Sequence, residues 1–271
     1  MIRKWLRVIP QLLPMLLLQY PFYRHRSRHP ERCEPKDDFA YFKPLAEKFV
    51  RRLRCSYIIQ GKENLPEGQG FFVGNHVSLI DPIIVYAISD RPLAFVAKKQ
   101  IRKIPLIGKA CLAMKCEFLD REDLRSEIKT FHAVDEKLAE YPELSYFVFP
   151  EGTRSVGPEF PLAKFHAGTF KIAVRRALPI VPMAMWLSER CLDHRYHYHH
   201  YPIQITYLKP ILPETYQTMT NAEIAALAQS EIDEELKRMK AKDRELVKSL
   251  NHYSDKKTDK VLFHHHYKSK G

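Results

Sequence analysis

Three short, mostly apolar segments of this chain each run directly into a cluster of polar and charged residues. The segments are residues 71–73, 116–119 and 144–149, and the clusters after them begin at Asn75, Asp120 and Pro150. Short apolar runs that stop at such clusters are typical of buried strands. Because ligands bind beyond the carboxyl ends of the strands in open α/β sheets, the pattern predicts an α/β fold with a site at one sheet edge.

The first cluster, residues 75–81, places a histidine and a carboxylate where they can pair. A strand is predicted before it and a helix over 82–88 after it, with Asp81 as the N-cap and Pro82 at the first position. In one continuous helix His76 and Asp81 would lie roughly 140° apart, at about 100° per residue, whereas a turn lets them meet. In the alternative reading, Asp81 only caps the helix and His76 is an ordinary loop histidine.

Four blocks of sequence carry a family resemblance: Asn75 to Asp81, Glu117 to Arg121, Phe149 to Ser155 and Leu178 to Met183. In order and spacing they resemble the blocks of the glycerophospholipid acyltransferase family, most closely its 1-acylglycerol-3-phosphate acyltransferases, over about residues 58 to 210. The second block departs from the usual Gly-x-x-Phe-Ile-Asp-Arg, since Lys115 stands at its start and Leu119 replaces isoleucine. The resemblance implies one catalytic domain with a mixed, largely parallel central sheet flanked by helices.

The chemistry of acyl transfer fits these residue types. A thioester is already activated, so the acceptor hydroxyl needs a base to remove its proton rather than a serine nucleophile. We expect His76 to be that base and Asp81 to fix its tautomer and stabilise the imidazolium. The chain contains no G-x-S-x-G elbow, which disfavours a serine lipase.

The resemblance assigns the acceptor's phosphate to a group drawn from three parts of the chain: Lys98, Arg121, Glu151, Gly152, Thr153 and Arg154. Arginine suits this role because its guanidinium can form two parallel hydrogen bonds to phosphate, although a surface ion pair is the commoner fate of an arginine. Glu151 is expected to hold the loop in shape, and Lys98 is either a phosphate contact or a solvated lysine.

The fourth block is associated with the acyl donor and acyl chain through Pro179, Ile180, Val181 and Pro182. Its apolar character suits a core strand equally well, and we expect both.

Charge and cysteine content restrict the partners. The net charge is +12, with a pI near 9.4, which favours anionic partners: nucleic acid, acidic lipid or an acidic carrier protein. No nucleic-acid-binding motif accompanies the charge. The 5 cysteines form no C-x2-C pair, so the sequence predicts neither a metal site nor a disulfide framework, and a reducing cytosolic environment is expected.

The N-terminal segment combines an uncharged run, Val8 to Tyr23, with basic residues on both sides: Arg3, Lys4, Arg7, Arg24, Arg26 and Arg28. The run is shorter than the roughly 20 residues of a membrane span and is broken by three prolines. We expect it to lie in the interface of an anionic membrane, at its cytoplasmic face, as a peripheral or monotopic anchor. The alternative is a proline-kinked helix packed on the domain.

These patterns divide the chain into three parts: a membrane-interface segment over 1–34, an acyltransferase domain over 35–220, and a charged helix with a mobile tail over 221–271. The expected reaction moves a fatty acyl group from acyl coenzyme A or acyl carrier protein to 1-acylglycerol 3-phosphate, with no cofactor beyond the carrier of the thioester. The nearer alternative is another acceptor, such as glycerol 3-phosphate or another lysophospholipid. The remoter alternative is a non-catalytic lipid-binding protein.

Overall fold

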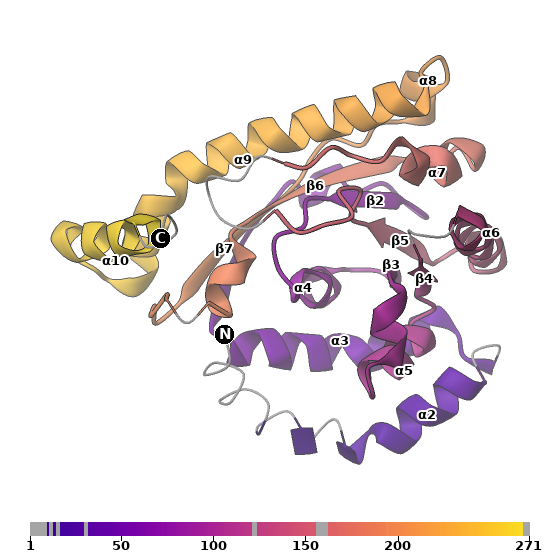
Figure 1. The fold of residues 1–271 in the computed structure, drawn as a ribbon, viewed down its shortest axis with the longest axis horizontal. Helices are drawn as coiled ribbons and strands as arrows, with labels where there is room; N and C mark the ends of the chain where they lie inside the picture. The colour runs from indigo at the N-terminus through magenta and orange to yellow at the C-terminus, as the bar shows by residue number, and fades with distance from the viewer. Residues whose placement is uncertain are drawn as a thin grey trace.

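The computed structural model describes Pro10, Leu13, Pro14 and residues 17–29, 32–120, 124–155, 162–193 and 195–267. Its centre is a seven-stranded sheet with the order β1-β7-β6-β2-β5-β3-β4 (Figure 1). The strands are β1 Cys55–Gln60, β2 Phe71–Gly74, β3 Leu93–Lys98, β4 Glu117–Leu119, β5 Ser145–Val148, β6 Ile180–Trp186 and β7 Tyr201–Tyr207. All neighbours pair in parallel except β6 and β7, so the sheet is mixed and mostly parallel.

Helices cover both faces of this sheet. They are α2 Tyr20–Arg28, α3 Pro35–Arg52, α4 Asp81–Ile88, α5 Ile107–Ala113, α6 Leu124–Glu140, α7 Lys171–Arg175, α8 Pro213–Tyr216, α9 Asn221–Asn251 and α10 Asp255–Tyr267. Short 3₁₀ turns lie in the connections between these elements: η2 Lys62–Asn64, η3 Lys99–Lys103, η4 Ala167–Phe170 and η5 Ser188–Cys191. In Figure 1, α7 and α9 lie above the sheet, while α2, α3, α4 and α5 lie below it.

The central strands form because their residues can be buried on both faces. Every residue of β2 and β5 is buried, and both strands are continuous apolar runs apart from Gly74 and Ser145. Such runs are typical of parallel strands that helices cover on both sides. The two segments predicted as strands at residues 71–73 and 144–149 are therefore adjacent partners in the middle of the sheet.

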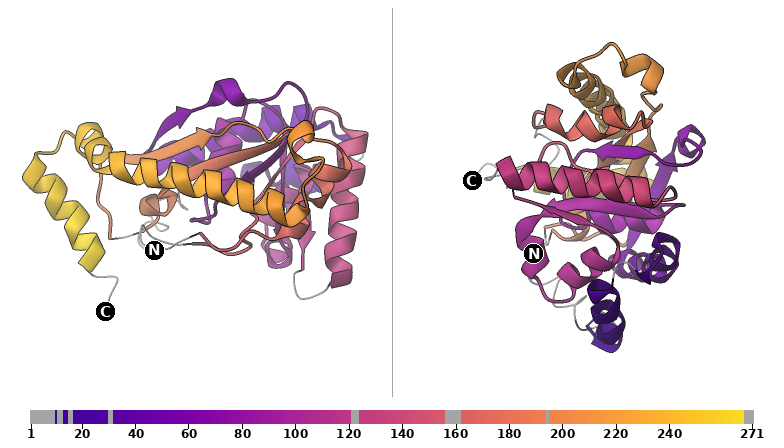
Figure 2. Two further views of the ribbon diagram at one scale, coloured as in Figure 1. Left: turned by 90° about the horizontal axis from the view of Figure 1, so that it is seen from above. Right: turned by 90° about the vertical axis from the view of Figure 1, so that its right-hand side faces the viewer.

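The long helix α9 is part of the same core. Thr220 and Glu223 form a capping box at its start, with the Thr220 N–H donating to the Glu223 carboxylate at 2.7 Å. Its inward residues, which include Ile224, Ile232 and Val247, are buried and pack on β6 and β7. Figure 2, seen from above, shows α9 lying along the sheet.

Part of the predicted C-terminal tail is helical. Residues 255–267 form α10, and Thr258 at its first turns is fully buried. Arg244 on α9 pairs with Asp259 on α10 at 2.9 Å, which ties the two helices together. Lys248 on α9 also pairs with Asp255 on α10 at 2.7 Å, and these ion pairs lie at the surface.

The N-terminal segment is described in part, since residues 1–9, 11–12, 15–16 and 30–31 lie outside the described residues. Helix α2 packs on the domain through aromatic rings: Phe22 stacks on Tyr41 at 3.6 Å, and Tyr23 on Phe42 at 5.4 Å, both between ring centroids. Arg26 also pairs with Asp38 on α3. Among the described residues, no helix is both long enough and apolar enough to cross a bilayer.

Candidate active site

The candidate site lies at one edge of the sheet, where five strands end. Strands β6, β2, β5, β3 and β4 run parallel to one another, so their carboxyl ends share this edge. The loop after β2 carries His76, the loop after β5 carries Glu151 to Ser155, and β3 ends at Lys98. The first and third sequence blocks therefore meet at the edge where ligands bind in α/β sheets, and Lys98 lies at the same edge.

His76 and Asp81 are in contact. The Nδ1 atom of His76 lies 2.8 Å from Oδ2 of Asp81, and the Asp81 side chain is fully buried. A carboxylate can only accept, so Nδ1 carries the proton and Nε2 keeps its lone pair in the neutral ring. The His76 side chain is 18% exposed, so part of it is accessible to a ligand.

The predicted N-cap role of Asp81 is wrong. Asp81 is the first residue of α4, Ile80 occupies the N-cap position, and no side chain caps the helix. The Asp81 carboxylate points back into the preceding turn, where Oδ2 accepts the N–H groups of Val77 and Ser78, each at 2.8 Å. These hydrogen bonds shape the turn that brings His76 onto the carboxylate.

A residue that the sequence reasoning missed completes the surroundings of Asp81. The hydroxyl of Ser188, in η5 just after β6, donates a hydrogen bond to Oδ1 of Asp81. Ser188 is fully buried, and the preceding Leu187 has a left-handed backbone with φ of 50°. Both Asp81 oxygens are thus held by hydrogen bonds, which stabilises a buried negative charge.

The imidazole of His76 is also held by packing. Its ring stacks on Phe149 with 4.3 Å between centroids and an interplanar angle of 27°. Phe149 is the first residue of the third block and follows β5 directly. The stack and the hydrogen bond to Asp81 together fix the ring orientation, so the free Nε2 has a defined direction.

Glu151 joins the loop after β5 to the loop after β2. Its Oε1 accepts the His76 N–H at 2.7 Å, and its Oε2 accepts from the Ser155 hydroxyl and from the Ala163 N–H. The Ser155 N–H in turn donates to the His76 carbonyl at 2.8 Å. Glu151 is 3% exposed and both of its oxygens are engaged, so it holds the loops together rather than facing a ligand.

The remaining residues of the expected phosphate group lie around this loop. Gly152 has a φ of 66°, a left-handed conformation that glycine adopts without strain, and Thr153 and Arg154 after it are exposed. Lys98, at the end of β3, is exposed on the same sheet edge. Arg121 lies outside the described residues.

The fourth block forms the first half of β6. Ile180 and Val181 are fully buried there, and Ile180 to Met183 pair with Phe71 to Gly74 of β2. These residues are core-strand residues whose backbone is engaged on both sides, since the Pro182 carbonyl also accepts from Leu208 and the Pro179 carbonyl from Phe71. Their expected role toward the acyl donor stays a prediction.

Asn75 joins the site to the carboxyl-terminal end of β6. Its side-chain amide donates to the Met185 carbonyl and accepts the Met185 N–H, both at 2.8 Å, and Asn75 is buried. The side chain thus imitates a strand backbone just beyond the end of β2. The hydrogen bonds fix where the loop with His76 begins.

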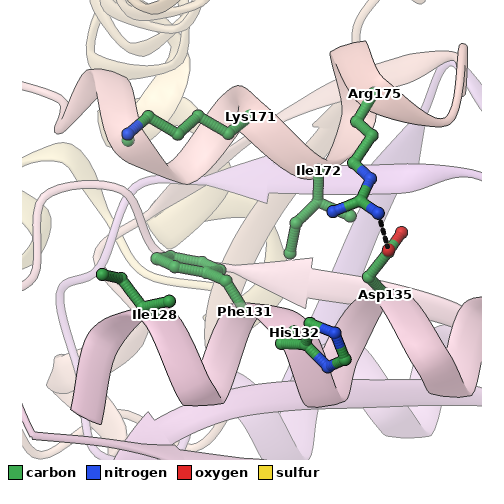
Figure 3. A pocket seen from close by; sticks show the side chains of 8 residues that line it. Ile128, Phe131, His132, Asp135, Lys171, Ile172 and Arg175 are labelled. Atoms are coloured by element: carbon green, nitrogen blue, oxygen red, sulfur yellow. Dashed lines mark ion pairs between the residues drawn. The ribbon is translucent and has the colours of Figure 1, made fainter. Parts of the chain in front are cut away.

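A separate cavity of about 240 Å³ opens between α6 and α7 (Figure 3). Phe131 and Ile172 form its apolar walls, and Arg175 pairs with Asp135 at its rim at 3.3 Å. Its lining includes no residue of the four blocks. Within the part of the chain that the structure describes, no group of three or more His, Cys, Asp or Glu side chains could hold a metal ion.

A histidine whose Nδ1 is held by a buried carboxylate has the arrangement that general-base chemistry requires. Residues 56–186 match the family model named Acyltransferase. The solved structure of the 1-acyl-sn-glycerophosphate acyltransferase PlsC from Thermotoga maritima is similar in fold, with a TM-score of 0.66 and 21% identity, over 88% of this chain and 98% of that one.

Two curated relatives extend the comparison. A probable 1-acyl-sn-glycerol-3-phosphate acyltransferase of Mycoplasma pneumoniae is 25% identical over 231 residues, which cover 80% of this chain and 85% of that protein. A 1-acyl-sn-glycerol-3-phosphate acyltransferase of Chlamydomonas reinhardtii is 31% identical over 157 residues, or 54% of this chain. The chain spans 46% of the length of that second relative.

Proposed function

We propose that this protein is an O-acyltransferase that moves a fatty acyl group from an acyl thioester to the free hydroxyl of 1-acylglycerol 3-phosphate, giving phosphatidic acid. The observation that carries the proposal is the contact of 2.8 Å between His76 Nδ1 and the buried Asp81 carboxylate, which leaves Nε2 as a base. The relatives named as 1-acyl-sn-glycerol-3-phosphate acyltransferases support the choice of acceptor.

In this mechanism the His76 Nε2 takes the proton of the acceptor hydroxyl as its oxygen attacks the thioester carbonyl. The new C–O bond forms, the C–S bond breaks, and the imidazolium returns its proton to the leaving thiolate. The buried Asp81 stabilises the transient imidazolium, and its hydrogen bonds from Val77, Ser78 and Ser188 keep it in place. No acyl-enzyme is needed.

Arg154 is the proposed anchor for the acceptor's phosphate. It is exposed beside Ser155, whose N–H is bonded to the His76 carbonyl, so its backbone is fixed relative to the base. A guanidinium can hold phosphate with two parallel hydrogen bonds. Lys98 at the same sheet edge, and Arg121 from the second block, are proposed to add to this site.

The acceptor is a lipid, so we propose that the enzyme works as a peripheral or monotopic protein at the cytoplasmic face of a membrane. The net charge of +12 favours an anionic lipid surface, and equally an acidic acyl carrier protein as donor beside acyl coenzyme A. Residues 1–34 are proposed as the membrane-interface segment, 35–220 as the acyltransferase domain and 221–271 as its C-terminal extension. No other cofactor is proposed.

The experiment that tests this function is mass spectrometry of products made by the purified protein. The acceptors are 1-acylglycerol 3-phosphate, glycerol 3-phosphate and head-group-bearing lysophospholipids, each offered with acyl coenzyme A and with acyl carrier protein. Phosphatidic acid as the dominant product, absent with His76→Ala, is the expected result. A product from a different acceptor would reassign the substrate, and no transfer from any pair would indicate a lipid-binding protein without catalysis.

A further inference from the structure

Two large aliphatic side chains are exposed where η3 leads into α5, one in the connection and one at the first residue of α5. Ile104 is 40% exposed and Ile107 is 51% exposed. Neither packs in the core, although Leu106 between them does. Exposed aliphatic residues that gather at one place mark a surface for a partner, whereas single ones need no explanation.

The backbone holds this connection rigidly. Leu106 has a φ of 67°, and the Ile107 N–H donates to the Pro105 carbonyl at 2.8 Å, which is a strained three-residue turn. A Cβ on Gly108 would lie 2.2 Å from the Arg102 carbonyl, so the chain closes tightly on itself here. The backbone conformation of this connection thus holds Ile104 and Ile107 in exposed positions.

The start of α5 lies against the start of α2. The Lys109 ammonium donates to the Tyr20 hydroxyl at 2.6 Å and lies 4.4 Å from the centroid of the Tyr20 ring. Just before Tyr20, Leu17 is 54% exposed and Leu18 is 83% exposed. Four exposed aliphatic side chains therefore flank this one contact.

The same region is strongly basic. The stretch from residue 98 to 116 contains no acidic residue, and its exposed bases include Arg102 and Lys103. On α2, Arg24 and Arg28 are exposed too. The hydrogen bond and charge of Lys109 lower the pKa of the Tyr20 phenol, with smaller contributions from Arg24 and Arg28.

The position of this surface relative to the base follows from the topology. Turn η3 begins directly after β3, at the sheet edge that carries His76. In the turn next to His76, Leu79 is also 49% exposed. A bilayer of anionic lipids has negatively charged head groups above a hydrocarbon layer. Basic side chains can contact those head groups, and aliphatic side chains can insert into the hydrocarbon.

We propose that Leu17, Leu18, Ile104 and Ile107, together with Arg102 and Lys103, form a docking surface for an anionic lipid bilayer. The isoleucines and leucines enter the acyl boundary, and the two bases contact lipid phosphates. This docking surface rests on the proposed lipid acceptor, and it would hold the His76 edge at the membrane where that acceptor resides.

The test is flotation of the full chain with vesicles of phosphatidylcholine mixed with phosphatidylglycerol, and with vesicles of phosphatidylcholine alone. The variant Ile104→Gln/Ile107→Gln should weaken partition into both vesicles by about tenfold or more. The matched control is Ile128→Gln/Leu212→Gln, which changes two exposed aliphatic residues on other elements and should partition like the wild type.

A second pair of variants separates charge from insertion. Arg102→Gln/Lys103→Gln should weaken partition only into the vesicles with phosphatidylglycerol, by about fivefold for each base, and added salt should remove the difference. The control Lys242→Gln/Lys256→Gln removes two exposed lysines from α9 and α10 and should change nothing.

Turnover of a soluble short-chain acceptor keeps this inference distinct from the proposed reaction. It should be unchanged in the Ile104→Gln/Ile107→Gln variant, because docking acts only on membrane-embedded acceptor. Partition equal to that of the control variant would overturn the docking surface. So would a loss of soluble-acceptor turnover with normal partition, since the isoleucines would then line the substrate path. Absence of transfer in the wild type would refute the proposed reaction alone.

Discussion

Ser188 donates its hydroxyl hydrogen to the Asp81 oxygen that faces away from His76. The two residues are 107 positions apart and are both fully buried. Asp81 therefore acts through a carboxylate whose two oxygens have different tasks: Oδ2 holds the imidazole and the turn, and Oδ1 is held by Ser188.

This division predicts different outcomes for two substitutions of Asp81. In Asp81→Asn, the amide oxygen can take the place of Oδ2, and the Ser188 hydroxyl can turn to accept from the amide NH₂. The fold and the His76 tautomer should survive, and only the negative charge is lost. Asp81→Ala leaves the N–H groups of Val77 and Ser78 without their acceptor and should cost about 1–3 kcal/mol for each. Thermal unfolding and turnover of both variants test this prediction. An equal loss of stability in Asp81→Asn and Asp81→Ala would contradict it.

Ser188→Ala tests the role of the hydroxyl itself. We expect a lower kcat with little change in the acceptor KM, because the alanine loosens Asp81 without touching substrate, and a stability loss of about 1.5–3 kcal/mol, the range for a hydrogen bond to a charged group. Ser89→Ala is the control, since Ser89 is also buried and donates to the Arg91 carbonyl at 2.8 Å at the other end of α4. Similar kcat losses in both variants would mean that Ser188 is only structural.

His76→Ala should lower turnover by roughly 100-fold to 10,000-fold, the usual range for loss of a general base. Partition into vesicles should stay normal, because His76 lies outside the proposed docking surface. Steady-state kinetics with 1-acylglycerol 3-phosphate give the measurement. Turnover near that of the wild type would refute the role of His76 as the base.

Arg154→Lys should raise the KM for the phosphorylated acceptor much more than the KM for the acyl donor. An ammonium cannot reproduce the two parallel hydrogen bonds of a guanidinium to phosphate. Arg51→Lys, an exposed arginine at the end of α3, is the matched control and should leave both KM values unchanged. If the acceptor KM does not move in Arg154→Lys, the phosphate is bound elsewhere, and Lys98 is the next residue to substitute.

The buried ion pair between Arg190 and Asp243 should support the same site from α9. The two side chains form a bidentate contact at 2.8 and 2.6 Å. Burial lowers the pKa of Arg190, but the neighbouring Asp243 carboxylate outweighs burial, so the net effect is a raised pKa. Asp243→Ala should lower the free energy of unfolding by about 3–5 kcal/mol, because it leaves a buried charge unpaired. Arg190→Met/Asp243→Leu should restore most of that loss, as measured by chemical denaturation. A double variant no better than Asp243→Ala would contradict this account.

The sequence was informative wherever a local pattern reflected local structure. The apolar runs at residues 71–73 and 144–149 predicted β2 and β5, and the turn geometry of residues 75–81 predicted the contact between His76 and Asp81. The departure at Lys115 also has a structural meaning. Lys115 has a φ of 63°, so the position where the family usually has glycine requires a left-handed backbone.

Ser188 and Phe149 could not be assigned a role from the sequence. A single serine after a strand has no spacing or periodicity that would mark it, and its partner Asp81 is brought near only by the pairing of β2 with β6. Phe149 looked like the end of a core strand, since an aromatic residue there suits packing as well as stacking on a histidine. In the same way, the direction of the Asp81 carboxylate depends on the turn behind it, which a capping pattern does not describe.

The ion pair between Arg190 and α9 also bears on the smallest functional unit of this protein. The four sequence blocks end at residue 183, yet Ser188 lies beyond them, and Asp243, which holds the same 3₁₀ turn, lies far along α9. A chain truncated before α9 would keep the residues of all four blocks. It would lose the ion pair between Arg190 and Asp243 and the apolar side chains of α9 that cover β6 and β7. Complementation by separately expressed fragments should therefore require the C-terminal helix, even though it carries none of the motif residues.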